Sequence, residues 1–156
     1  MQLKKYKYQD SLDLFPNCPP DSYKNIDIRC FRWVFKDNIS DSFIPMNLIK
    51  EPPPRMLDDS DLMCKGYGLS LFDNFENGLS RFENLYQKKR GVSHKDFISE
   101  KGNSIAMLEM DGNEGVYGDL NTGNGHFTLH EYEGTDLSSK IVNITEIFDE
   151  NGNFKR

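Results

Sequence analysis

Apolar side chains recur between residues 73 and 91 with the spacing of an α-helix. Four of them fall at i, i+4, i+7 and i+11 and form one apolar stripe: Phe75, Leu79, Phe82 and Tyr86. Asp73 can cap the start, with Glu76 three residues on, and Gly91 can end the helix in a left-handed conformation. The pattern predicts one long amphipathic helix over about residues 74–90. A second, short helix is expected to start at Ser93 and to stop at Gly102.

The rest of the ordered pattern favours strands. Residues 26–36 are rich in β-branched and aromatic side chains and have two largely apolar faces, as a central strand does. Shorter runs of the same kind follow at residues 67–72, 105–110, 116–120, 126–133 and 141–148. Turn sequences rich in Asn and Gly separate the later runs. We therefore expect an α+β fold with a mainly antiparallel sheet.

Three segments lack such a pattern. Residues 1–25 are polar and contain proline, which predicts a loosely docked lead-in. Residues 37–65 have no clear period and include three consecutive prolines, Pro52–Pro54; loops of this length are often functional. Residues 149–156 are expected to form a frayed tail, or to turn the chain back at Asn151-Gly152-Asn153.

Length and composition narrow the class of protein. A chain of 156 residues is expected to form a single domain, residues 1–156. Its net charge of −6 disfavours wholesale electrostatic binding to nucleic acid. Apolar runs are only a few residues long, so we expect neither a membrane span nor a signal-peptide core, and we predict a cytoplasmic protein. The three cysteines, Cys18, Cys30 and Cys64, show no metal-ligand spacing and are expected to be reduced thiols.

Arg32 and a pair of glutamates are out of place in this pattern. Arg32 shares a strand face with apolar residues, so its guanidinium either pairs with a buried carboxylate, lines a pocket or reaches water at the sheet's end. Glu131 and Glu133 point to one face about 7 Å apart. Arg32 is the obvious candidate partner for them, and a solvated strand end is the alternative.

A third polar cluster follows the glycine at position 125. His126, Thr128, His130 and Tyr132 share one strand face and could form a polar groove, in which histidine is suited to proton transfer near neutral pH. His126 and His130 lie roughly 13 Å apart on a strand, too far for one ion, so we expect no metal site. An exposed polar sheet face is the alternative.

Two stretches resemble a family of small uncharacterised bacterial proteins. They are Tyr67-Gly68-Leu69-Ser70-Leu71-Phe72 and the segment from Gly125-His126-Phe127 to Glu131-Tyr132-Glu133-Gly134, followed by Asp136-Leu137. The resemblance covers about residues 64–142. It implies a cytoplasmic bacterial protein and no particular activity.

A weaker likeness is to ADP-ribosyltransferases of the cholera-toxin type, which use an arginine on an early strand, a Ser-Thr-Ser strand and a later Glu-x-Glu. Arg32, Ser70 and Glu131-Tyr132-Glu133 occur in that order, although Leu69-Ser70-Leu71 replaces Ser-Thr-Ser. The resemblance implies that Arg32 grips the NAD phosphates, a role for which Arg29 competes. It also implies that Ser70 orders the site, Glu133 binds the nicotinamide ribose and Glu131 orients the acceptor.

Two functions therefore stay open. The leading prediction is a non-catalytic binding or accessory domain without a cofactor, recognising a protein or a small ligand near His126 to Glu133. The alternative is an ADP-ribosyltransferase-like enzyme, active or degenerate, which would bind NAD. An enzyme of that kind requires Arg32, Ser70 and Glu133 to converge on one pocket.

Overall fold

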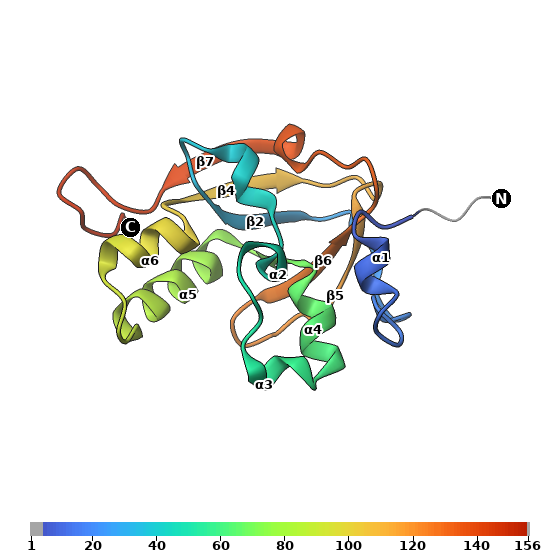
Figure 1. Cartoon of the computed structure of the whole chain (residues 1–156). Helices are drawn as coiled ribbons and strands as arrows, with labels where there is room; N and C mark the ends of the chain where they lie inside the picture. Colours follow the sequence, from blue (N-terminus) through green and yellow to red (C-terminus); the bar gives the residue numbers. More distant parts are fainter. Residues whose placement is uncertain (1–4, 156) are drawn as a thin grey trace.

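A seven-stranded antiparallel sheet forms the body of the computed structural model, which describes residues 5–155 (Figure 1). The strand order across the sheet is β1-β5-β6-β3-β2-β4-β7. The strands are β1 Lys24–Asn25, β2 Arg29–Val34, β3 Leu69–Phe72, β4 Ser104–Glu109, β5 Gly115–Gly118, β6 His126–Glu131 and β7 Ile141–Glu146. The predicted α+β class, with a mainly antiparallel sheet in one compact domain, is confirmed.

Two helices cover one part of the sheet and short helices surround the rest (Figure 1). The helices are α1 Gln9–Leu12, α2 Met46–Ile49, α3 Pro54–Leu57, α4 Ser60–Gly66, α5 Phe75–Lys88 and α6 His94–Lys101, with 3-10 helices η1 Ile39–Phe43 and η2 Leu137–Lys140. Helix α5 is the predicted amphipathic helix. The segment 37–65, which shows no period, contains four short helices instead of one long loop.

The helix starts show how closely sequence signals locate a boundary. Ser93 caps α6 as predicted, because its hydroxyl accepts a hydrogen bond from the backbone N–H of Asp96 at 3.1 Å. The expected Asp73 cap of α5 is wrong by one residue. Asn74 has the extended backbone of a cap, and its side chain accepts from the N–H of Asn77 at 2.8 Å.

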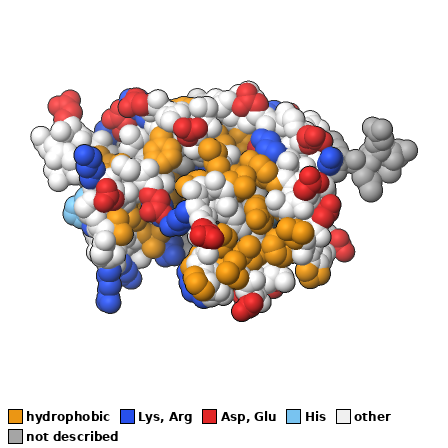
Figure 2. Space-filling view, in the orientation of Figure 1, with side chains coloured by type: hydrophobic (Ala, Val, Ile, Leu, Met, Phe, Trp, Pro, Cys, Tyr) orange, Lys and Arg blue, Asp and Glu red, His pale blue; other side chains and the backbone are white. Residues whose placement is uncertain are grey.

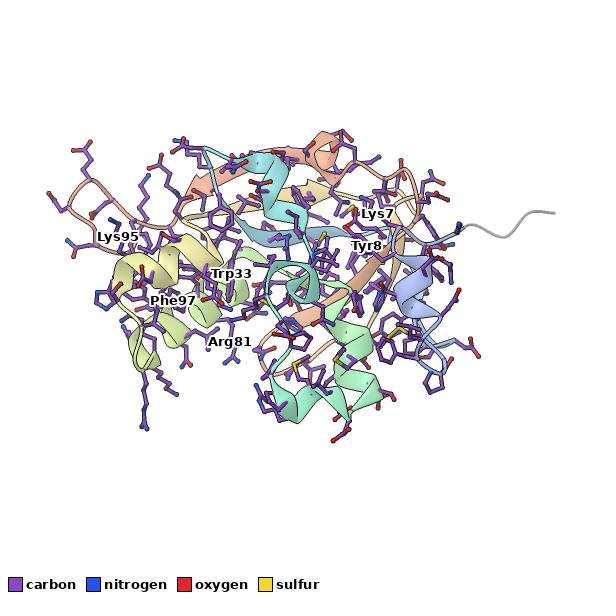
Figure 3. The ribbon with its side chains drawn as sticks, viewed as in Figure 1. Lys7, Tyr8, Trp33, Arg81, Lys95 and Phe97 are labelled. Atoms are coloured by element: carbon purple, nitrogen blue, oxygen red, sulfur yellow. A yellow bond between two sulfur atoms is a disulfide. The ribbon has the colours of Figure 1, made fainter. Side chains whose placement is uncertain are left out.

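The sheet packs a core against each of its faces. The larger core lies on the face that carries Cys30, Val34, Leu71 and Phe127. On the other face, α5 and α6 bury an aromatic cluster centred on Phe82, whose ring contacts Trp33, Tyr86, Phe97, Phe148 and Phe154. Trp33 and Phe97 both point into the space between the sheet and these helices (Figure 3).

The lead-in is held more firmly than expected. Leu12 and Tyr23 are buried, and the N–H of Lys7 donates to the carbonyl of Glu131 at 2.9 Å. A disulfide joins Cys18 to Cys64. The polar composition of residues 1–25 conceals these few anchors. The prediction of reduced thiols is wrong for this pair, whose members are 46 residues apart; Cys30 is free and buried, as expected.

The C-terminal segment folds back, which is one of the two outcomes that its sequence left open. Asp149 and Gly152 close a turn, and Phe148 and Phe154 form a β-bridge. The Phe154 ring lies 5.3 Å from that of Tyr86. Burial of this aromatic ring provides the driving force that a polar tail lacks.

Within the described residues, no helix has the length and apolar character needed to cross a membrane. The sequence prediction of no membrane span agrees with this finding.

Candidate functional site

A pocket of about 360 Å³ opens where strands β2 and β3 diverge. These strands are paired with each other only at Phe31 and Phe72. Beyond that point β2 pairs only with β4 and β3 only with β6, so a gap opens between β2 and β3. The segment from η1 to α4 closes the gap from outside. The apolar side chains that line the pocket are Trp33, Phe35, Ile44, Met46, Ile49, Met56, Leu62 and Leu69.

Arg32 spans the gap between the two strands. Its Nη1 donates to the carbonyl of Ser70 at 2.7 Å, and its Nε donates to the carbonyl of Ser42 at 2.8 Å. The guanidinium also lies 5.7 Å from the centre of the Phe43 ring. These contacts hold the charged group in one orientation at the wall of the pocket.

No carboxylate among the described residues forms a salt bridge with Arg32. The other charged side chains that line the pocket do have partners. Lys65 pairs with Asp119 at 3.4 Å, and Asp41 accepts from Asn38. Glu100 pairs with Lys50 at 2.6 Å and with Lys101, which also lines the pocket, at 3.6 Å. Burial lowers the pKa of Arg32 to about 10, opposed by the charge of Glu131, so the guanidinium is protonated at neutral pH. Arg32 is thus the cation of this pocket that no salt bridge neutralises.

Ser70 and His126 meet at the same pocket, although 56 residues separate them. Antiparallel pairing of β3 with β6 places both side chains on one face of the sheet, and His126 Nε2 lies 2.9 Å from Ser70 Oγ. Burial, followed by the charges of Arg81 and Lys65, lowers the pKa of His126. A neutral imidazole can accept the serine proton, which is the arrangement of a nucleophile and its general base.

The remaining predicted site residues are distributed over other parts of the molecule. Thr128 is buried and lines the pocket beside Ser70. His130 is buried between the ring of Tyr23 and the sulfur of Cys64. Tyr132 stacks on the ring of Tyr6. Of the four residues expected to form a polar groove, only His126 and Thr128 therefore line the pocket.

Neither of the two glutamates forms a salt bridge with Arg32 in the described part of the chain. Glu131 points into the protein and pairs with Lys7 at 2.6 Å, instead of with Arg32 as expected (Figure 3 labels Lys7). Burial raises the pKa of Glu131, against the charges of Lys7 and Arg32. Glu133 lines a second hollow, of about 340 Å³, formed with residues 5–11. Arg32 and Ser70 thus share one pocket, and Glu133 lines a different one.

Sequence reasoning did not find the outer wall of the pocket. Residues from 41 to 66 supply most of that wall, and the only signal was the length of a segment without a period. Hydrophobic side chains gather on the surface of this segment (Figure 2), where Leu48, Ile49 and Leu57 are exposed.

Comparisons with known proteins found no matching family model, no matching curated protein and no matching solved structure. Both resemblances described above therefore stay predictions, as does the cytoplasmic location.

Proposed function

We propose that this chain is a binding domain for a small organic anion with an apolar body. One observation carries the proposal: the Arg32 guanidinium lines an apolar pocket without a salt bridge to any described carboxylate. A partly buried charge is costly unless it is paired, and a bound carboxylate or phosphate supplies that pair. The volume of about 360 Å³ suits a ligand of the size of an aromatic acid.

The test compares the binding of anionic aromatic ligands with that of an uncharged ligand of similar shape. Benzoate and phenyl phosphate are expected to bind the wild-type protein in calorimetry, and benzamide is expected to bind more weakly. Arg32→Gln should weaken binding about 10- to 100-fold, because a hydrogen bond to a charged group contributes roughly 1.5–3 kcal/mol.

Arg29 provides the matched control. It lies on the same strand but is exposed and pairs with Glu109, so Arg29→Gln should leave anion binding unchanged. Arg32→Lys keeps the charge and guards against a folding defect; it should retain part of the affinity. Equal binding of benzoate by the wild-type protein and by a folded Arg32→Gln variant would sink the proposal.

A second candidate function, ester hydrolysis, is favoured by the Ser70–His126 contact of 2.9 Å. In that case Ser70 Oγ attacks the acyl carbon of the ester while His126 takes the serine proton. The ester C–O bond breaks, and His126 gives that proton to the leaving alcohol. Water then cleaves the acyl-serine, which releases the acid and restores Ser70, while Arg32 orients an anionic substrate. The NAD-transferase alternative has less support, because Glu133 does not line this pocket.

Hydrolysis of p-nitrophenyl esters tests the second candidate. Ser70→Ala and His126→Gln should each abolish the activity, whereas Ser99→Ala, on the exposed surface of α6, should not. The rate should rise with pH as His126 loses its proton, and the midpoint of the rise should lie below pH 6.5 because the pKa of His126 is lowered. A rate unaffected by Ser70→Ala would leave binding as the only function of the pocket.

A further inference from the structure

Two sulfurs and one imidazole converge from three distant segments of the chain. Cys18 lies in the loop between α1 and β1, Cys64 lies on α4, and His130 lies on β6. Their potential ligand atoms are all within 4.8 Å of one another. Nε2 of His130 faces Cys64 Sγ at 3.9 Å. The cluster is separate from the pocket at Arg32, which none of these three residues lines.

His130 is poorly satisfied in the disulfide form. Its side chain is 1% exposed, its Nδ1 has no hydrogen-bond partner among the described residues, and its Nε2 makes only the long contact with sulfur. Buried polar groups without partners are rare in folded proteins and call for an explanation. A cation bound at Nε2 would replace the long sulfur contact of that nitrogen with a short bond, whereas Nδ1 would gain no partner from it.

The surrounding backbone fits the imidazole in this position. A Cβ atom at residue 68 would lie 3.1 Å from Cε1 of His130 and 2.7 Å from the methyl group of Thr128, so Gly68 leaves the room that the ring occupies. The ring also lies 6.0 Å from that of Tyr23 on its other side. The orientation of Nε2 toward the sulfurs is therefore built into the fold.

The separation of Cys64 Sγ and His130 Nε2 also suits one ion. Zinc binds cysteine sulfur at about 2.3 Å and histidine nitrogen at about 2.0 Å, so tetrahedral ligands of these kinds lie roughly 3.5 Å apart. The observed Sγ–Nε2 distance of 3.9 Å is close to that separation. Soft sulfur with imidazole selects zinc-like ions over magnesium or calcium.

We propose that reduction of the Cys18–Cys64 disulfide creates a binding site for one Zn²⁺-like ion, with both thiolates and His130 Nε2 as its protein ligands. A dithiol reductant transfers two electrons and two protons to the pair: the S–S bond breaks, two thiols form, and the reductant becomes a disulfide. The ion then forms two metal–sulfur bonds and one metal–nitrogen bond, and two protons leave to solvent. A water molecule takes the fourth position.

This site would tie the same segments together in either redox state. The disulfide links the loop after α1 to α4, and the metal would link that loop, α4 and β6. The inference departs from our sequence prediction of no metal site. That prediction considered His126 with His130, and the spacing of the cysteines along the chain, whereas the fold brings His130 to two cysteines from distant segments.

Cobalt provides a visible probe for the full-length chain. The protein is first reduced with a phosphine, which is then removed under anaerobic conditions. One Co²⁺ ion per chain is expected to bind, and it should give thiolate charge-transfer bands and tetrahedral d–d absorption bands. Zn²⁺ should abolish these bands by displacement. The oxidised protein should show no such bands.

Variants separate this site from general thiol binding. Cys18→Ser, a change in a half-buried loop, should weaken Co²⁺ binding by more than roughly 100-fold, since loss of an outer partner alone costs about 10- to 100-fold. Cys30→Ala should bind as the wild-type protein does, because Cys30 is buried in the sheet core. Absence of thiolate bands in the reduced wild-type protein, or equal binding by the folded Cys18→Ser variant, would overturn the proposal.

Discussion

Lys7→Met is expected to lower the free energy of unfolding by about 3 kcal/mol, because it leaves a buried carboxylate without its cation. The Glu131 side chain is 2% exposed, and Lys7 Nζ donates to its Oε2 at 2.6 Å and to the carbonyl of Thr135 at 2.7 Å. Glu131 Oε1 is buried without a hydrogen bond among the described residues. Urea denaturation of both proteins at neutral pH measures the difference.

Two further variants show whether burial is the cause. Lys36→Met removes an ion pair with Glu146 in which both side chains are about half exposed, so it should cost much less stability than Lys7→Met. In the double variant Lys7→Met/Glu131→Met, apolar side chains replace both charges, and most of the lost stability should return. Similar small losses for Lys7→Met and Lys36→Met would contradict a buried pair.

The elements that local pattern determines were predicted well. The stripe of Phe75, Leu79 and Phe82 located α5, and Ser93 located the start of α6. Both signals involve neighbours within one or two helical turns. The lead-in was misjudged because its order comes from a distant contact, the Cys18–Cys64 disulfide. For the last residues, the sequence left fraying and folding back open, because the packing of Phe154 on Tyr86 is also a distant contact.

The candidate site was predictable only in part, for the same reason. Arg32 was identified because a charged residue on an apolar strand face has few acceptable environments, and lining a pocket was one of those named. The partnership of Ser70 with His126 depends on the register of β3 against β6, which no local pattern reveals. Glu131 was matched to the wrong cation, because nothing in the lead-in indicated that Lys7 would return to β6.

The aromatic cluster between α5 and the sheet should be the other site of large mutational effect. Phe82 is fully buried, and its ring centre lies within 6.4 Å of the rings of five other aromatic residues. Phe82→Ala removes these contacts and leaves a cavity that the surrounding rings cannot fill. It should therefore lower the free energy of unfolding by about 3–5 kcal/mol, measured by urea denaturation with an unchanged slope.

Phe154→Ala distinguishes the centre of the cluster from its edge. Phe154 is only partly buried and lies on the segment that folds back after β7, so part of its ring surface already faces water. Because less apolar surface is lost and no closed cavity forms, this variant should cost no more than half as much as Phe82→Ala. If Phe154→Ala leaves the free energy of unfolding unchanged within error, the last residues do not pack on Tyr86 in solution. A loss below about 1 kcal/mol for Phe82→Ala would be inconsistent with a close-packed cluster, since truncating a buried aromatic ring in a rigid core removes both its transfer free energy and its dispersion contacts.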